Sequence, residues 1–83
     1  MAAILVIDDD SIVLMFMKNC LADGHTIHCC ETYSEAESCL SENNIDLVLL
    51  DLNLRGVQGT EIVSLLRSKF NGKIYLFSAI DTS

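Results

Sequence analysis

The sequence alternates short apolar runs with longer amphipathic stretches, and this alternation limits the folds that the chain can adopt. Residues 3–7, 26–30, 45–50 and 74–77 read as four strands. The first and third are apolar at nearly every position, which is typical of strands buried on both faces. Apolar residues recur at helical spacing between the runs. We therefore predict the order βαβαβαβ, which implies a parallel sheet with helices on both faces.

The expected helices carry recognisable end signals. Asp10 or Ser11 is placed to cap the first helix, and Gly24 to end it. Ser34 and Glu37 have the spacing of a capping box, which predicts that the second helix begins at Ser34. The side chains expected to face the core from the first and third helices are Val13, Phe16, Met17, Cys20, Leu21, Ile62, Val63, Leu66 and Phe70.

Length and charge narrow the class of protein. A chain of 83 residues is one domain at most, so we predict a single domain over residues 1–83. The formal net charge of −7 argues against nucleic acid and anionic membranes as partners, because both require clustered Lys and Arg. No apolar run is long enough to span a membrane. We expect a cytoplasmic protein.

Four cysteines are present, and none of them forms a CxxC pair. The favoured interpretation is that all four are reduced thiols, as expected in the cytoplasm. A metal site built from the neighbouring residues His25, His28, Cys29 and Cys30 is an alternative, but no matching pair of ligands occurs elsewhere in the chain.

Polar residues follow three of the predicted strands. Asp8 and Asp9 end the first, Asp51 the third and Ser78 the fourth. Ligands of open parallel sheets bind at the carboxyl ends of the strands, so these side chains converge if the third strand pairs beside the first. Clustered carboxylates require a cation, and oxygen ligands without His or Cys favour Mg²⁺. A carboxylate can also attack phosphorus and form an aspartyl phosphate.

Three segments together resemble the signatures of bacterial response-regulator receiver domains. They are ILVIDDDS at residues 4–11, DLVLLDLNLRGVQG at residues 46–59 and IYLFSA at residues 74–79. The resemblance implies a flavodoxin-like three-layer α/β sandwich with a parallel sheet in strand order 2-1-3-4. It also implies that Asp51 accepts a phosphoryl group from a histidine kinase or phosphotransfer protein.

The same resemblance assigns the other site residues. Asp9 would bind Mg²⁺ directly and Asp8 mostly through water, while the backbone carbonyl of Asn53 would be a further metal ligand. Ser78 would be the switch hydroxyl, and the backbone amide of Ala79 would help to hold the phosphoryl group. In addition, Gly59 matches the glycine that closes the loop after the acceptor, whereas Arg55 stands where many receivers have proline.

The sequence also departs from the receiver pattern at its end. A fourth helix, a fifth strand and a fifth helix are expected in receivers, and the chain stops before them. The resemblance therefore implies that the phosphoryl-binding lysine of the fifth strand is missing, since Lys69 and Lys73 do not match its position. We expect phosphorylation to be impaired by this loss. A fragment of a longer receiver and a naturally short chain are equally compatible with the sequence.

An open sheet edge and an unbroken apolar run at residues 12–17 predict self-association. We expect a homodimer that buries the first helix and the open side of the sheet. We expect no enzymatic turnover. One alternative function is a non-catalytic, dimerising interaction module derived from a receiver. Another is a phosphatase resembling the haloacid dehalogenases, with Asp8 as nucleophile and Asp10 as general acid, but that alternative leaves Asp51 unexplained.

Overall fold

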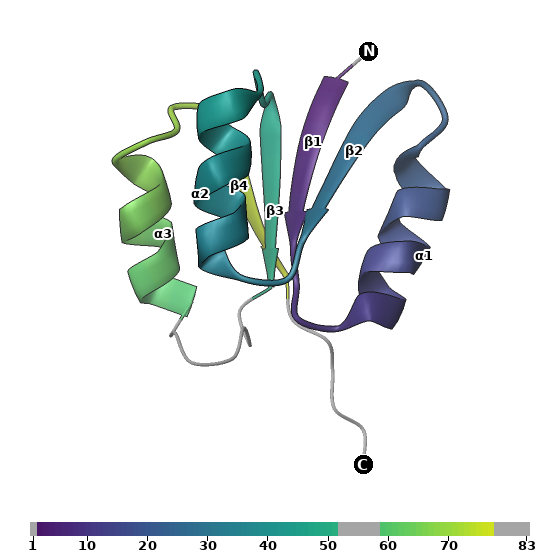
Figure 1. Cartoon of the computed structure of the whole chain (residues 1–83), viewed down its shortest axis with the longest axis horizontal. Coiled ribbons are helices and arrows are strands. Elements are labelled where there is room, and N and C mark those ends of the chain that lie inside the picture. Colours follow the sequence, from purple (N-terminus) through teal and green to yellow (C-terminus); the bar gives the residue numbers. More distant parts are fainter. Residues whose placement is uncertain (1, 52–58, 78–83) are drawn as a thin grey trace.

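A computed structural model describes residues 2–51 and 59–77 of the chain, and these residues form a three-layer α/β sandwich. The strands are β1 (Ala2–Ile7), β2 (His25–Cys30), β3 (Leu47–Asp51) and β4 (Lys73–Phe77). The helices are α1 (Ser11–Leu21), α2 (Tyr33–Glu42) and α3 (Gly59–Arg67). Figure 1 shows α1 on one side of the sheet and α2 and α3 on the other. The predicted element order is confirmed.

The four strands are parallel and lie in the order β2-β1-β3-β4, as the resemblance implied. The register pairs Ile7 of β1 with Leu50 of β3. This register has a direct consequence for the site, because it brings the residues that follow Ile7 and Leu50 to the same edge of the sheet. The start of β1 is held by Asp46, whose backbone N–H donates to the carbonyl of Ala3 at 2.8 Å and whose carboxylate accepts from the Ala3 N–H at 2.8 Å.

Each face of the sheet has its own core, because successive strand residues point to opposite faces. On the side of α2 and α3, Leu5, Val48 and Leu50 pack with Ile62 and Leu66, and all five are fully buried. On the side of α1, the core is smaller and consists of Ile4, Val6 and Leu14 with partly buried neighbours. Within the described residues, two helices thus cover one face and a single helix covers the other.

The orientation of α1 differs from the one predicted. Leu14, which the sequence placed outside the core-facing set, is the buried residue of the helix, and Met17 and Leu21 follow it at helical spacing against the sheet. Phe16, which was expected to face the core, is 64% exposed, and so are Ile12 and Met15 to a similar extent. The prediction was therefore confirmed for Met17 and Leu21 and wrong for Phe16 and Cys20, which are exposed. The outer side of α1 consequently carries three large apolar side chains.

The start of α2 also differs from the prediction. The helix begins at Tyr33 rather than Ser34, and its cap is Thr32, whose hydroxyl accepts a hydrogen bond from the Glu35 N–H at 3.2 Å. The carboxylate of Glu35 in turn accepts from the backbone N–H of Glu31 at 3.3 Å. The reciprocal arrangement of a capping box is therefore present, but it lies two residues before the predicted Ser34–Glu37 pair.

We expect the substitution Thr32→Ala to destabilise the fold by about 1 kcal/mol, because it leaves the Glu35 N–H without its intramolecular acceptor. Urea denaturation followed by circular dichroism measures this loss. Ser34→Ala is the matched control, since Ser34 lies inside the helix and should tolerate alanine with little change. If Ser34→Ala destabilised the fold more than Thr32→Ala does, the cap would be Ser34, as the sequence predicted.

Within the described ranges, no helix combines the length and the apolar character required to cross a lipid bilayer. The four cysteines are free thiols; Cys30 and Cys39 are buried, whereas Cys20 and Cys29 are exposed.

Candidate metal and phospho-acceptor site

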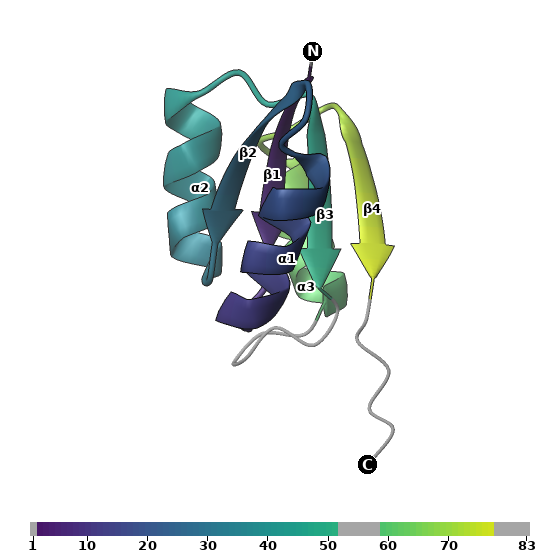
Figure 2. The same cartoon turned by 90° about the vertical axis from the view of Figure 1, so that its right-hand side faces the viewer.

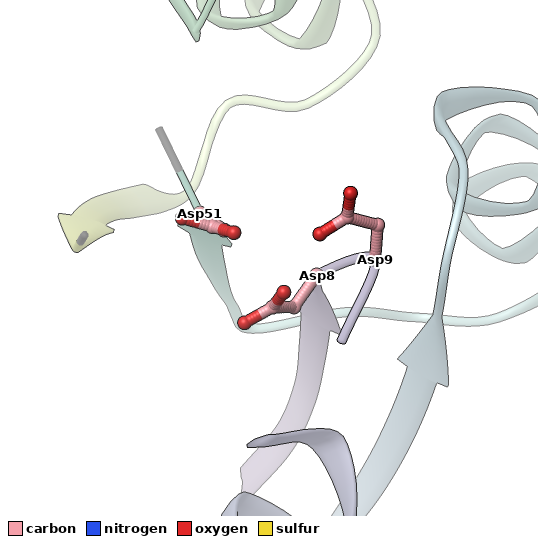
Figure 3. Close-up of side chains that lie close together, drawn as sticks. All are labelled: Asp8, Asp9 and Asp51. Carbon is pink, nitrogen blue, oxygen red and sulfur yellow. The ribbon is translucent and has the colours of Figure 1, made fainter. Parts of the chain in front are cut away.

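Three carboxylates meet at the carboxyl edge of the two central strands. Asp8 and Asp9 follow β1 directly, and Asp51 is the last residue of β3. One oxygen from each lies within 4.8 Å of the others. Figure 3 shows Asp51 reaching from its strand toward the pair that follows β1. The structure therefore confirms the predicted convergence for the three aspartates.

Two of the three carboxylates are removed from solvent. Asp8 is 1% exposed and Asp51 is 4% exposed, while Asp9 is partly accessible. Burial raises the pKa of Asp8 to about 6, and its hydrogen bond and charge repulsion with Asp51 act in the same direction. The site thus concentrates negative charge in a place where water cannot screen it, and a cation is the natural means of compensation.

Backbone contacts fix the position of Asp8. The Asp8 N–H donates to the carbonyl of Cys30 at 3.0 Å, which extends the pairing of β1 with β2 by one residue. The Asp10 N–H donates to the Asp8 carboxylate at 2.9 Å, a contact that opposes the rise in the pKa of Asp8. This role of Asp10 was not predicted from the sequence. The three consecutive aspartates after a strand were the available signal, since an aspartate often binds the backbone two residues on.

Asp10 has a second, structural role at the start of α1. Its carboxylate accepts a hydrogen bond from the Ile12 N–H at 2.9 Å, which confirms the predicted cap. This contact turns the Asp10 side chain toward the helix end. The phosphatase alternative needed Asp10 as a general acid, and a side chain that caps a helix is poorly suited to that task.

The donor set fits a hard divalent cation such as Mg²⁺. It consists of three carboxylates that can each offer one oxygen, and neither sulfur nor imidazole is among them. The partial exposure of Asp9 leaves room for water and for oxygens of a ligand, which Mg²⁺ usually retains in its coordination shell. The metal-ligand roles predicted for Asp8, Asp9 and Asp51 are compatible with this geometry.

We expect Mg²⁺ to bind roughly ten times more weakly at pH 5 than at pH 7, because most Asp8 carboxyls are protonated below their pKa of about 6. Calorimetric titration at the two pH values measures this ratio. The metal-free protein should respond in the opposite sense: the raised pKa stabilises the fold fully below pH 3.8, and this contribution disappears as the pH rises through 6. A constant affinity between pH 5 and pH 7 would contradict the assignment of Asp8.

Of the remaining predicted site residues, Gly59 alone lies in the described part of the chain. Asn53, Arg55, Ser78 and Ala79 are outside the described residues. Gly59 is the first residue of α3. Asp8, Asp9 and Asp51, the acidic trio, are the group of potential metal ligands found in the described ranges, and this group does not include the His and Cys residues considered above. Those residues alternate along β2, so neighbours such as His28 and Cys29 point to opposite faces.

The strand order and the cluster of carboxylates at the carboxyl edge of the sheet together define the class of protein, which is a receiver domain with a flavodoxin-like fold. Comparison with known proteins agrees with this class. Residues 4–83 match the response regulator receiver domain family. The chain is 31% identical over 83 residues to the regulatory protein VanR of Enterococcus faecium, an alignment that covers 95% of this chain and 35% of VanR. It thus spans about a third of that relative's length.

Solved structures give the same result. The response regulator TrrA of Thermotoga maritima, in complex with Mg²⁺ and beryllium fluoride, superposes with a TM-score of 0.85 at 34% identity, covering 98% of this chain and 72% of TrrA. The response regulator MaeR bound to beryllium trifluoride gives a TM-score of 0.83 at 32% identity, covering 98% of this chain and 70% of MaeR. The chain belongs to the response regulator receiver domain family.

Proposed function

We propose that this chain accepts a phosphoryl group on Asp51 from a phosphohistidine of a histidine kinase or phosphotransfer protein. The observation that supports the proposal most directly is the grouping of Asp51 with Asp8 and Asp9 within 4.8 Å at the carboxyl edge of β1 and β3. Asp51 ends β3, which lies next to β1 in the interior of the described sheet, so its carboxylate stands beside the pair that follows β1. It is thus positioned for attack by its carboxylate on a phosphorus atom held at this edge.

The transfer itself requires little covalent chemistry from the protein. A carboxylate oxygen of Asp51 forms the new O–P bond while the N–P bond of the phosphohistidine breaks. The electron pair of that bond remains on the imidazole nitrogen, which takes up a proton. The burial of Asp51 keeps bulk water away from the acyl phosphate that results. Asp8 and Asp9 would hold a divalent metal ion, and bound Mg²⁺ would supply charge neutralisation on the transferring group.

Mass spectrometry after incubation with acetyl phosphate and Mg²⁺ tests the proposal. We expect a gain of one phosphoryl group that maps to Asp51 after proteolysis and disappears when the metal is chelated. Acetyl phosphate is a suitable donor because its transfer forms the same O–P bond and releases acetate. Absence of any gain at millimolar donor and Mg²⁺ would leave the second candidate, a non-catalytic interaction module.

A specific observation favours that second candidate. The outer side of α1 exposes Ile12, Met15 and Phe16, and such a group of large apolar side chains is typical of a protein contact. Tyr75 and Leu76 of β4 form a second group of exposed apolar side chains. Both groups support self-association, which we propose for this chain. We also propose that the protein is cytoplasmic, that it binds neither nucleic acid nor membranes, and that it has no enzymatic turnover.

A further inference from the structure

Two of the four cysteines lie in the core between the sheet and α2. Cys30 is the last residue of β2, and Cys39 lies on the buried side of α2 together with Ala36. Cys30 pairs with Ile7 in the parallel register of β1 and β2, so both side chains point to the face that α2 covers. Figure 2 shows α2 running beside β2. The exposed fractions of Cys30 and Cys39 are only 6% and 9%, so two thiols share one buried layer.

The two buried thiols contact each other. Burial raises the pKa of both, that of Cys30 to about 12. A hydrogen bond between the thiols adds to the rise in the pKa of Cys30 and opposes the rise at Cys39, which identifies Cys30 as the donor. The side-chain amide of Asn43 donates a further hydrogen bond to the Cys39 sulfur at 3.7 Å, and it also donates to the Cys39 carbonyl at 3.1 Å. The Cys39 sulfur therefore accepts from two donors.

The direction of these hydrogen bonds gives the two sulfur atoms different roles. The thiolate is the reactive form of a cysteine, and donors that point at a sulfur favour that form. Cys39 accepts from Asn43 and from Cys30, so it is the sulfur that attacks an oxidant first. Cys30 is in contact with Cys39 and is the sulfur that resolves the product. Burial excludes bulky oxidants, so the oxidant that suits this pair is a small hydroperoxide.

The two exposed cysteines are separate from this pair. Successive residues of β2 point to opposite faces, so Cys29 lies on the side of α1, where its thiol donates to the carbonyl of Leu14 at 3.8 Å. Cys20 is exposed on α1 itself. Both can be replaced without any change in the layer between β2 and α2. The chemistry of the buried pair can therefore be measured on its own.

We propose that hydrogen peroxide joins Cys30 and Cys39 in a reversible disulfide. The Cys39 thiolate attacks one oxygen of the peroxide, the O–O bond breaks, and the departing hydroxide takes up the proton that Cys39 released and forms water. The Cys30 thiolate then attacks the sulfur of the resulting sulfenic acid, and the S–O bond breaks as a second water leaves with the proton of Cys30. Two thiols thus lose two electrons, and the peroxide is reduced to two waters. A dithiol returns the pair to its reduced form.

The disulfide acts on the acidic trio through the backbone of Cys30. The carbonyl of Cys30 accepts the hydrogen bond from the Asp8 N–H at 3.0 Å, and this contact helps to place the Asp8 carboxylate. A disulfide requires the two sulfur atoms to approach to about 2.05 Å, much closer than a hydrogen-bonded pair, and this approach draws Cys30 toward α2. We expect the oxidised chain to bind Mg²⁺ roughly three-fold more weakly as a result. This consequence rests on the proposed function, whereas the disulfide itself does not.

The variant Cys20→Ser/Cys29→Ser tests the disulfide, because it keeps only the buried pair. After peroxide treatment, quenching with catalase, unfolding and alkylation, we expect both remaining cysteines to be unalkylated. Three glutamates lie between Cys30 and Cys39, so a glutamate-specific protease should release two peptides joined by a disulfide that dithiothreitol separates. Alkylation of both cysteines, or sulfinic acid at Cys39 with no linked peptide, would overturn the proposal and leave the thiols as packing groups of the core.

Further variants in the same background test the roles of the two sulfur atoms, with circular dichroism to confirm that each is folded. Cys39→Ala should leave Cys30 fully alkylated after peroxide, because its partner is gone. Asn43→Ala keeps both thiols and should slow disulfide formation roughly three-fold, since one donor to the Cys39 sulfur is lost. Asn44→Ala is the matched control at the exposed neighbouring position and should not slow it. Equal rates for the two asparagine variants would contradict the first attack by Cys39.

Calorimetric titration of Cys20→Ser/Cys29→Ser with Mg²⁺, before and after peroxide, measures the link to the acidic trio. A sample reduced again with dithiothreitol is the control and should regain the affinity of the untreated protein. Because binding linkage is reciprocal, saturating Mg²⁺ should shift the thiol–disulfide equilibrium toward the thiols by the same factor. Equal Mg²⁺ affinities of the reduced and oxidised forms would contradict the link through Cys30. If neither form binds Mg²⁺, the proposed function fails, while the linked peptide still decides the disulfide.

Discussion

The substitution Asp51→Asn should abolish phosphoryl uptake and at the same time stabilise the metal-free fold. The first effect follows because the amide of asparagine is not a nucleophile toward phosphorus under conditions in which a carboxylate is. The second follows because Asp51 and Asp8 are buried beside one another, so one of two repelling charges is removed. We expect a gain of about 1–2 kcal/mol at pH 7, which raises the Tm by roughly 4–8 °C per kcal/mol in a domain of this size.

Mass spectrometry with acetyl phosphate and a thermal melt in EDTA measure the two effects on one preparation. Asp23→Asn is the matched control: Asp23 lies in the exposed turn after α1, so both its uptake and its Tm should equal those of the unmodified chain. Uptake that persists in Asp51→Asn would place the acceptor elsewhere. A lower Tm would show that the hydrogen bond between Asp51 and Asp8 outweighs their repulsion.

The opposite effects on function and stability follow from how the site is built. The backbone places Asp8 and Asp51 by strand register alone, so the carboxylates are brought together whether or not a cation is present. This arrangement stores unfavourable electrostatic energy in the metal-free chain, and the binding of a cation would release it. Metal affinity and fold stability are therefore linked through the same pair of side chains.

The sheet and the acidic site were predictable from the sequence for one shared reason. Apolar runs define buried strands, and the residue after each run is then fixed at the carboxyl edge. Asp8 and Asp51 could be placed in this way without any knowledge of their surroundings. The pKa of Asp8 could not, because it depends mainly on how completely the neighbouring elements bury the carboxyl group.

The side of α1 that packs against the sheet was not predictable from the sequence. Six consecutive apolar residues at positions 12–17 cover most of the helix circumference, so periodicity does not single out the stripe that meets the sheet. Packing against the sheet determines which side of α1 is buried, and Leu14 packs there with Ile4 and Val6. The cap of α2 was ambiguous too, because Thr32–Glu35 and Ser34–Glu37 both have the spacing of a capping box.

The substitution Leu50→Ala should have the largest effect on the fold. Leu50 is fully buried next to Asp51 and packs with Ile62 and Leu66 in the core that two helices share. Truncating such a leucine costs about 2–5 kcal/mol, since the cavity that it leaves adds to the lost transfer energy. A domain of this length has a total stability of roughly 4–12 kcal/mol, so much of the variant should be unfolded in mild urea.

Leu65→Ala is the control that isolates burial from residue type. Leu65 lies on α3 like Ile62 and Leu66, but its side chain is 45% exposed, so the same truncation should cost less than about 1 kcal/mol. Urea denaturation of the two variants gives the difference directly. Because Leu50 precedes the acceptor, its loss should also loosen the carboxyl edge of β3 and weaken Mg²⁺ binding even at urea concentrations where the variant is folded. Equal stabilities for the two variants would mean that the core between the sheet and α3 is not packed as described.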